Sequence, residues 1–387
     1  MVRGGFGISY SPFPDDSYAY NFPVKQNNSY TNDGGYGIAT LPGGENVTLA
    51  RGFPALTLVT ILENGIIPNA DVNELYFVVN KHFRQPYVES WNLAVQQALP
   101  GNFALDVAYV ANHGVAQPCR CNINAATVVG LGNAGQPQFA QFGRTAETDF
   151  LFQGFSSSYN SLQVKLDRCY SSGLGITTAF TWAKALGYQD EDGGLAFYVN
   201  GEVPRNWRRL DFDRKFNFIQ SYIYELPFGK GKELLTHGVG GAVLGGWQIN
   251  GILSILSGTP LNTDGIGFVG NDGVLAAPGN ANTLNFFGDS IPTPKGNPKN
   301  GQPWFTPNVC SPTVATNCFA QPGNLQFGNL GPNVISGPGS WSLDASIFRT
   351  FTLSERFQVQ IRGEAFSLMN TPTWDNPDTN IGNKTFG

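Results

Sequence analysis

Bulky apolar residues alternate with small or polar residues along much of the chain. In the segment Phe103–Tyr109 the odd positions hold Phe, Leu, Val and Tyr, whereas the even positions hold Ala, Asp and Ala. The segment Leu174–Trp182 repeats the pattern, with Leu, Ile, Thr, Phe and Trp opposing Gly, Thr, Ala and Thr. A period of two places successive side chains on opposite faces of a strand. The pattern therefore predicts strands with one apolar face and one polar face.

Nine segments show this alternation, and their length indicates the environment. Most hold about 10 to 13 residues, which at roughly 3.3 Å per residue is enough to cross the ~25 Å apolar band of an outer-membrane barrel at a tilt of about 45°. Strands of soluble proteins average only about 5 to 6 residues, so the length favours a membrane. The predicted strands are 2–10, 88–99, 102–111, 158–169, 174–185, 214–226, 247–258, 340–351 and 356–369.

The connections between these segments alternate in length. Those after the second, fourth and eighth strands are tight turns, and 227–246 after the sixth is intermediate. Barrels of the outer membrane have short periplasmic turns and long extracellular loops, whereas a soluble sandwich has no reason to separate them by end. We therefore predict an all-β fold: a partial antiparallel up-and-down transmembrane β-barrel of about nine to ten strands. Its long extracellular loops are 11–87, 112–157, 186–213 and 259–339.

Composition agrees with a lipid-covered surface and argues against nucleic acid as a partner. Charged residues make up 13 % of the chain, against roughly 25 % in soluble proteins. No apolar run approaches the ~18 to 20 residues of a spanning helix, so outer-membrane lipid is expected to contact strands. The net charge is −5, and the largest basic cluster, Arg205–Arg209, holds only three arginines.

The cysteines offer one candidate structural site. Cys310 and Cys318 are separated by seven residues in a stretch rich in Pro, Asn and Thr, and could close a loop disulfide in an oxidising compartment. The alternative is two free thiols. Cys119, Cys121 and Cys169 complete no zinc pattern, and we expect no metal site or cofactor.

Few residues in the sequence indicate a catalytic site. The three histidines, His82, His113 and His237, have no Gly-x-Ser-x-Gly partner that would indicate a triad. The acidic run Asp190–Asp192 is conceivable as a Ca²⁺-binding loop, although a solvated acidic loop is favoured. Arg362 and Glu364 share one face of the last strand and are expected to pair in the lumen. The sequence thus predicts no enzyme.

Five blocks, in this order, resemble the C-terminal barrel of the Oar-like TonB-dependent receptors. The first reads QPYVESWNLAVQQALPGNFALDVAYVANHG, and together they cover about a third of the chain. The resemblance implies an outer-membrane location, uptake of an unidentified bulky extracellular ligand, and a TonB complex as partner of the full-length parent. The blocks are Gln85–Gly114, Ser158–Leu186, Asp211–Lys232, Leu244–Leu261 and Ser342–Trp374.

Chains of that family also carry a signal peptide, an Ig-like domain and a plug with a TonB-contacting segment. None of these is visible in residues 1–387, so we expect one partial barrel domain. Nine strands is an odd number, whereas bacterial single-chain barrels have even numbers, which also predicts a piece of a larger barrel.

Two other classes of protein stay open. A structural or adhesive surface protein would use the long loops to bind cells, matrix or glycans. A glycan hydrolase on a β-scaffold would need a close carboxylate pair in a cleft lined by Trp.

Overall fold

One antiparallel sheet dominates the computed structural model, which describes residues 1–12, 48, 50, 52, 62–64, 76–190, 194–261, 275–293, 300–352 and 354–387. Nine strands follow one another along it in chain order, and each pairs antiparallel with the next. They are β1 (Val2–Tyr10), β3 (Tyr87–Leu99), β4 (Phe103–Asn122), β5 (Thr148–Ser171), β6 (Leu174–Gly187), β8 (Phe216–Glu225), β9 (Trp247–Leu256), β12 (Ser340–Thr352) and β13 (Gln358–Ala365).

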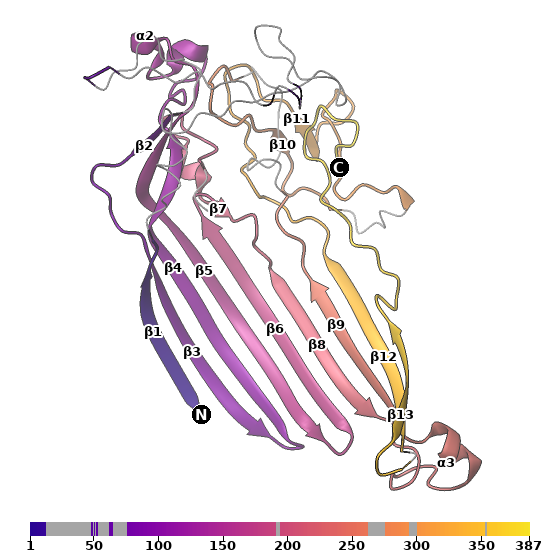
Figure 1. Ribbon diagram of the computed structural model, residues 1–387. Coiled ribbons are helices and arrows are strands. Elements are labelled where there is room, and N and C mark those ends of the chain that lie inside the picture. The colour runs from indigo at the N-terminus through magenta and orange to yellow at the C-terminus, as the bar shows by residue number, and fades with distance from the viewer. Residues whose placement is uncertain are drawn as a thin grey trace.

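The predicted all-β, up-and-down architecture is confirmed, and each of the nine predicted segments forms one of these strands. The sheet is curved, with β1 at one edge and β13 at the other (Figure 1). These two edges do not pair with each other in the part of the chain that the structure describes, so the sheet is a partial barrel.

Connection lengths separate by end, as predicted. The tight turns lie at one end of the sheet together with α3 (Gly238–Leu244), and the long loops gather at the other (Figure 1). The loop end also holds the short elements η1 (Gly132–Gly135), α2 (Phe139–Phe142), η2 (Val203–Asn206), β10 (Asn285–Phe287) and β11 (Cys318–Ala320). In the described ranges, no helix has the length and apolar character that a membrane crossing requires.

Three boundaries differ from the predicted ones by four residues or more. The range 112–157 was predicted as loop, but β4 continues to Asn122 and β5 begins at Thr148, past a register shift between Gly114 and Gln117. This extension carries no apolar alternation, because it lies among the loops rather than in lipid. At the other edge β13 ends at Ala365, since Ser367 adopts a positive φ of 48° that extended backbone does not allow.

Two short strands of the main sheet were not predicted, and neither were β10 and β11, which form a separate two-stranded sheet. β2 (Tyr76–Val79) pairs in parallel with the first residues of β5, and β7 (Arg208–Arg209) pairs antiparallel with the last residues of β6. Each is too short to show alternation. Most of the predicted loop 11–87 lies outside the described residues.

Register separates the two faces of the sheet. Tyr109, Leu162, Trp182 and Phe216 stand opposite one another across β4, β5, β6 and β8, so they share one face. Trp182 leaves 55 % of its surface exposed, which suits contact with lipid. We call this the outward face.

The opposite, inner face carries charges in pairs. Arg3 Nη2 lies 3.1 Å from Asp106 Oδ2, and Lys165 Nζ lies 2.6 Å from Asp167 Oδ2. At the edge strand β13, Arg362 and Glu364 form an ion pair of 3.3 Å, the partnership that their spacing indicates. A polar inner face is the arrangement expected of a barrel lumen.

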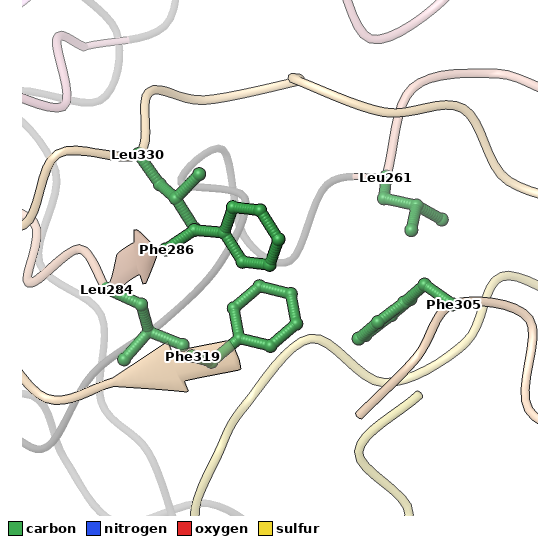
Figure 2. Close-up of a cluster of buried hydrophobic side chains, with 6 residues drawn as sticks. All are labelled: Leu261, Leu284, Phe286, Phe305, Phe319 and Leu330. Atoms are coloured by element: carbon green, nitrogen blue, oxygen red, sulfur yellow. The ribbon is translucent and has the colours of Figure 1, made fainter. Parts of the chain in front are cut away.

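The hydrophobic core lies among the loops rather than on the sheet. Its largest cluster consists of buried side chains between the last long loop and the C-terminal segment (Figure 2). The sheet keeps its own apolar side chains on the outward face, where lipid replaces a protein core. The cluster holds Leu261, Leu284, Phe286, Phe305, Phe319 and Leu330.

Candidate ligand-binding surface at the loop end

Tilted and edge-to-face aromatic rings hold the last long loop together. Phe319 of β11 lies with its ring centroid 5.0 Å from Phe286 of β10 and 5.7 Å from Phe305 (Figure 2). Phe386, near the end of the chain, contacts the same group at 5.2 Å from Phe319. Such pairs stabilise by about 0.5–1.5 kcal/mol each beyond their burial. The C-terminal segment is thereby fixed to the loop.

Two disulfides lie at this end of the molecule. Cys310 and Cys318, the pair named from the sequence, are joined, and their Cα atoms are 5.0 Å apart. Cys318 begins β11, so the bridge closes a short loop beside the aromatic core. Cys119 and Cys121 at the end of β4 form the second disulfide, which sequence reasoning missed. Their separation by one residue was a signal that could have suggested it.

Arg205 connects two loops that are distant in sequence. Its guanidinium carbon lies 4.7 Å from the ring centroid of Phe197 and 5.7 Å from that of Phe327. Its Nη1 pairs with Glu202 at 2.7 Å, and its Nη2 donates to the carbonyls of Gly328 and Leu330, both at 2.8 Å. The basic cluster Arg205–Arg209 therefore contains a cross-loop contact.

A second polar cluster lies where the loops meet the sheet. Arg208 Nη2 lies 2.8 Å from Asp190 Oδ2, and the Asp211 amide donates to Asp190 Oδ1 at 2.6 Å. Burial raises the pKa of Asp190 above its ordinary value, against the opposing influence of the Asp211 amide and Arg208. Asn333 completes the cluster by donating to Asp211 Oδ1 at 2.7 Å.

These contacts bear on the conceivable calcium loop. Asp190 already accepts from Arg208 and from the Asp211 amide, while Glu191 and Asp192 lie outside the described residues. No group of three or more His, Cys, Asp or Glu side chains in the described ranges is arranged to hold a metal ion.

The three histidines have different neighbours in the described part of the chain. His113 Nδ1 lies 3.6 Å from Glu89 on the sheet, and His237 Nδ1 lies 2.7 Å from the Thr236 hydroxyl at the far end, beside α3. His82 follows β2, where its amide donates to Asn80.

Five aromatic rings form a continuous ladder from the beginning of β5 into the loop that follows β6. Successive centroids are 6.4, 5.6, 5.0 and 5.3 Å apart. Phe152 and Trp207 leave 37 % and 39 % of their surfaces exposed. Large exposed rings at a loop surface are a candidate contact for a ligand with apolar faces. In order, the ladder is Phe150, Phe152, Phe155, Tyr188 and Trp207.

A cavity of about 350 Å³ opens on the inner face just below the loops. Asn112, Tyr159 and Ala185 stand opposite one another across β4, β5 and β6 and form its floor. Leu210 and Phe212, from the loop, form another part of its lining. The loop end thus combines a ladder of rings with a pocket that faces the lumen.

An open, long-stranded antiparallel sheet with an apolar outward face and a polar inner face defines part of an outer-membrane β-barrel. The sequence model of one family, described as "Outer membrane beta barrel domain", matches residues 1–387. The chain belongs to this family, and its location is the outer membrane. A comparison with curated protein sequences finds no match.

The chain is similar to solved structures that include one transporter and two receptors. The transporter YddB from Escherichia coli is 8 % identical with a TM-score of 0.38, over 77 % of this chain and 31 % of its own. The ferric preacinetobactin receptor BauA from Acinetobacter baumannii is 9 % identical with a TM-score of 0.35, over 74 % and 26 %. The ferripyoverdine receptor of Pseudomonas aeruginosa is 6 % identical with a TM-score of 0.34, over 74 % and 24 %. The chain spans less than a third of the length of each.

Proposed function

We propose that this chain is part of the barrel of an Oar-like TonB-dependent receptor, which takes up a bulky extracellular ligand and catalyses no reaction. The observation that carries the proposal is the ordered loop end, where the aromatic ladder and the inner-face cavity lie at the mouth of a polar lumen. The five sequence blocks that resemble that family support the same function.

The build of the loops suits capture of a ligand. The disulfide, the aromatic cluster and the cross-loop contacts of Arg205 order the loops before any ligand arrives. A preordered surface loses less conformational entropy on binding, which strengthens affinity. The exposed rings of Phe152 and Trp207 offer flat apolar area for sugar faces or aromatic groups.

Adhesion is the second candidate. The same ordered, exposed loop end would serve a surface protein that holds other cells, matrix or glycans. The two functions differ in whether a ligand crosses the membrane and whether that crossing needs TonB.

The test uses the whole reading frame that encodes this chain, expressed in a Gram-negative host with and without TonB. The probes are radiolabelled ferric siderophores and fluorescent oligosaccharides, and the measurement is their accumulation in washed cells. We expect one probe to accumulate only when TonB is present. W207A should lower that accumulation by about tenfold, the effect of about 1.4 kcal/mol, whereas W374A, at an exposed position far along the chain, should not.

Accumulation that is the same without TonB would overturn the transport proposal. Probes that bind to the cell surface, depend on Trp207 and never enter would support adhesion in its place.

A further inference from the structure

A second cavity, of about 650 Å³, lies on the other side of the sheet from the inner-face cavity. Tyr109, Leu162 and Trp182 in its lining belong to one register row of the outward face. Asn160 and Lys184 form the next row toward the loops, again opposite each other. The cavity therefore faces the membrane rather than the lumen, and it plays no part in the proposed uptake.

The outward face changes character at this cavity. The row Tyr109, Leu162, Trp182 and Phe216 is apolar and aromatic. One row nearer the loops, Ala111, Asn160 and Lys184 stand opposite one another. A further row brings His113, Ser158, Leu186 and Arg209 together. Aromatic rings mark the membrane interface in such barrels, so the cavity lies at the outer boundary of the lipid.

Positive charge predominates in the cavity lining. Lys184, Arg209 and Lys215 provide three cations against the single carboxylate of Asp213. Asp213 is already engaged, because its Oδ2 lies 2.9 Å from Arg209 Nε and its Oδ1 accepts the Ala185 amide at 2.7 Å. Within the described ranges, neither lysine ammonium has an ion-pair partner.

A further carboxylate of this face, Glu89, lies outside the cavity. Glu89 lies 3.6 Å from His113. The two lysines therefore present uncompensated charge beside apolar rings, at the depth where lipid headgroups lie. Long lysine side chains reach toward that level while their methylenes cover apolar surface.

We propose that this cavity binds the phosphorylated headgroup of a glycolipid of the outer leaflet. The ammonium groups of Lys184 and Lys215 pair with phosphate oxygens as charge-assisted hydrogen bonds. Tyr109 donates to Asn160 Oδ1 at 2.6 Å, which leaves the Asn160 amide nitrogen to donate to a sugar oxygen. The apolar surfaces of Leu162 and Trp182 lie where the acyl chains begin.

Size and charge favour a glycolipid over a bare phosphate. A volume of about 650 Å³ falls within the ~300–1,000 Å³ of sites that hold small organic molecules. A phosphate ion alone would fill only a small part of it. A neutral lipid would leave the two lysines without a counter-charge.

The test is native mass spectrometry of the complete gene product, purified from outer membranes in mild detergent and titrated with diphosphoryl lipid A. We expect K184Q/K215Q to weaken lipid A binding at least about tenfold, while K184R/K215R retains most of it. K81Q/K230Q, which removes two exposed lysines elsewhere, should bind as the unaltered protein does. Heat-dependent gel mobility checks that each variant folds, and the arginine variant separates lost charge from lost structure.

Three further probes fix the source of the phosphate. Dephosphorylated lipid A and phosphatidylglycerol should bind at least about tenfold more weakly than diphosphoryl lipid A, and millimolar inorganic phosphate should not displace it. Equal binding of either lipid, displacement by inorganic phosphate, or unchanged binding by K184Q/K215Q would overturn the proposal. None of these outcomes depends on TonB or on uptake.

Discussion

The guanidinium of Arg205 stacks on Phe197 at 4.7 Å while the same group donates to the carbonyl of Leu330, 125 residues further along the chain. This one side chain thus joins the loop after β6 to the loop after β9. We expect R205K to loosen both loops, because an ammonium cannot make the two carbonyl bonds and the ring contact together. The local opening free energy should fall by about 1–3 kcal/mol.

Hydrogen exchange measured by mass spectrometry checks this prediction. Peptides around Phe197 and Leu330 should both exchange roughly ten- to a hundredfold faster in R205K. R356K, in the exposed turn between β12 and β13, is the matched control and should leave both peptides unchanged. Faster exchange around Phe197 alone would mean that Arg205 does not couple the two loops.

The disulfide between Cys310 and Cys318 should order its loop and leave the sheet unaffected. A bridge that closes so short a loop contributes about 2–3 kcal/mol by restricting the unfolded chain. We expect C310S/C318S to become sensitive to protease between β10 and β11, while its heat-dependent gel mobility stays that of a folded barrel. Loss of the folded mobility would show that the loop supports the sheet as well.

The C-terminal segment should loosen in acid. Burial by itself would raise the pKa of Asp378, but hydrogen bonds from the Asn380 amide and from the Thr385 and Asn383 side chains outweigh it and lower that pKa. The folded state therefore favours the carboxylate. Its stabilisation is present above the ordinary value of about 3.9 and is lost as the pH falls through the lowered pKa.

Exchange of residues 378–387 at pH 7 and at decreasing pH tests this sign. The unaltered protein should show a protected segment at pH 7 that becomes exposed only as the pH falls below the ordinary value of about 3.9 and through the lowered pKa of Asp378, after correction for the intrinsic pH dependence of exchange. In D378N, residues 378–387 should exchange rapidly at pH 7 as well as at low pH. D375N, at an exposed neighbouring position, should behave as the unaltered protein. If residues 378–387 were still protected at pH 7 in D378N, the Asp378 carboxylate would not be what stabilises the segment.

The strands were predictable because two solvents act on them. Lipid on one side and water on the other impose alternation on β3, so residues such as Trp91 and Asn92 reveal their faces without any knowledge of their neighbours. The extension of β4 to Asn122 was not predictable from the pattern, because among the loops protein surrounds both faces and no alternation is required.

The loop end was less predictable for a different reason. Arg205 binds the carbonyls of Gly328 and Leu330, and no local pattern connects positions more than a hundred residues apart. The aromatic ladder joins Phe155 of β5 to Tyr188 beyond β6, a contact that depends on the register of the sheet. The cysteine pair at 310 and 318 could be named in advance, because its spacing indicates a closable loop.

The central claim is that one face of these strands contacts lipid. It is tested most directly by spin labels at Leu93 and Ala94, which are adjacent on β3 and lie on opposite faces. L93C and A94C, each made with C169S to remove the exposed free cysteine, are labelled and studied by power-saturation electron spin resonance in outer-membrane vesicles. The label at 93 should collide mainly with oxygen dissolved in lipid, and the label at 94 should show far less oxygen contact. Equal oxygen accessibility at the two positions, or the reverse order, would contradict the account.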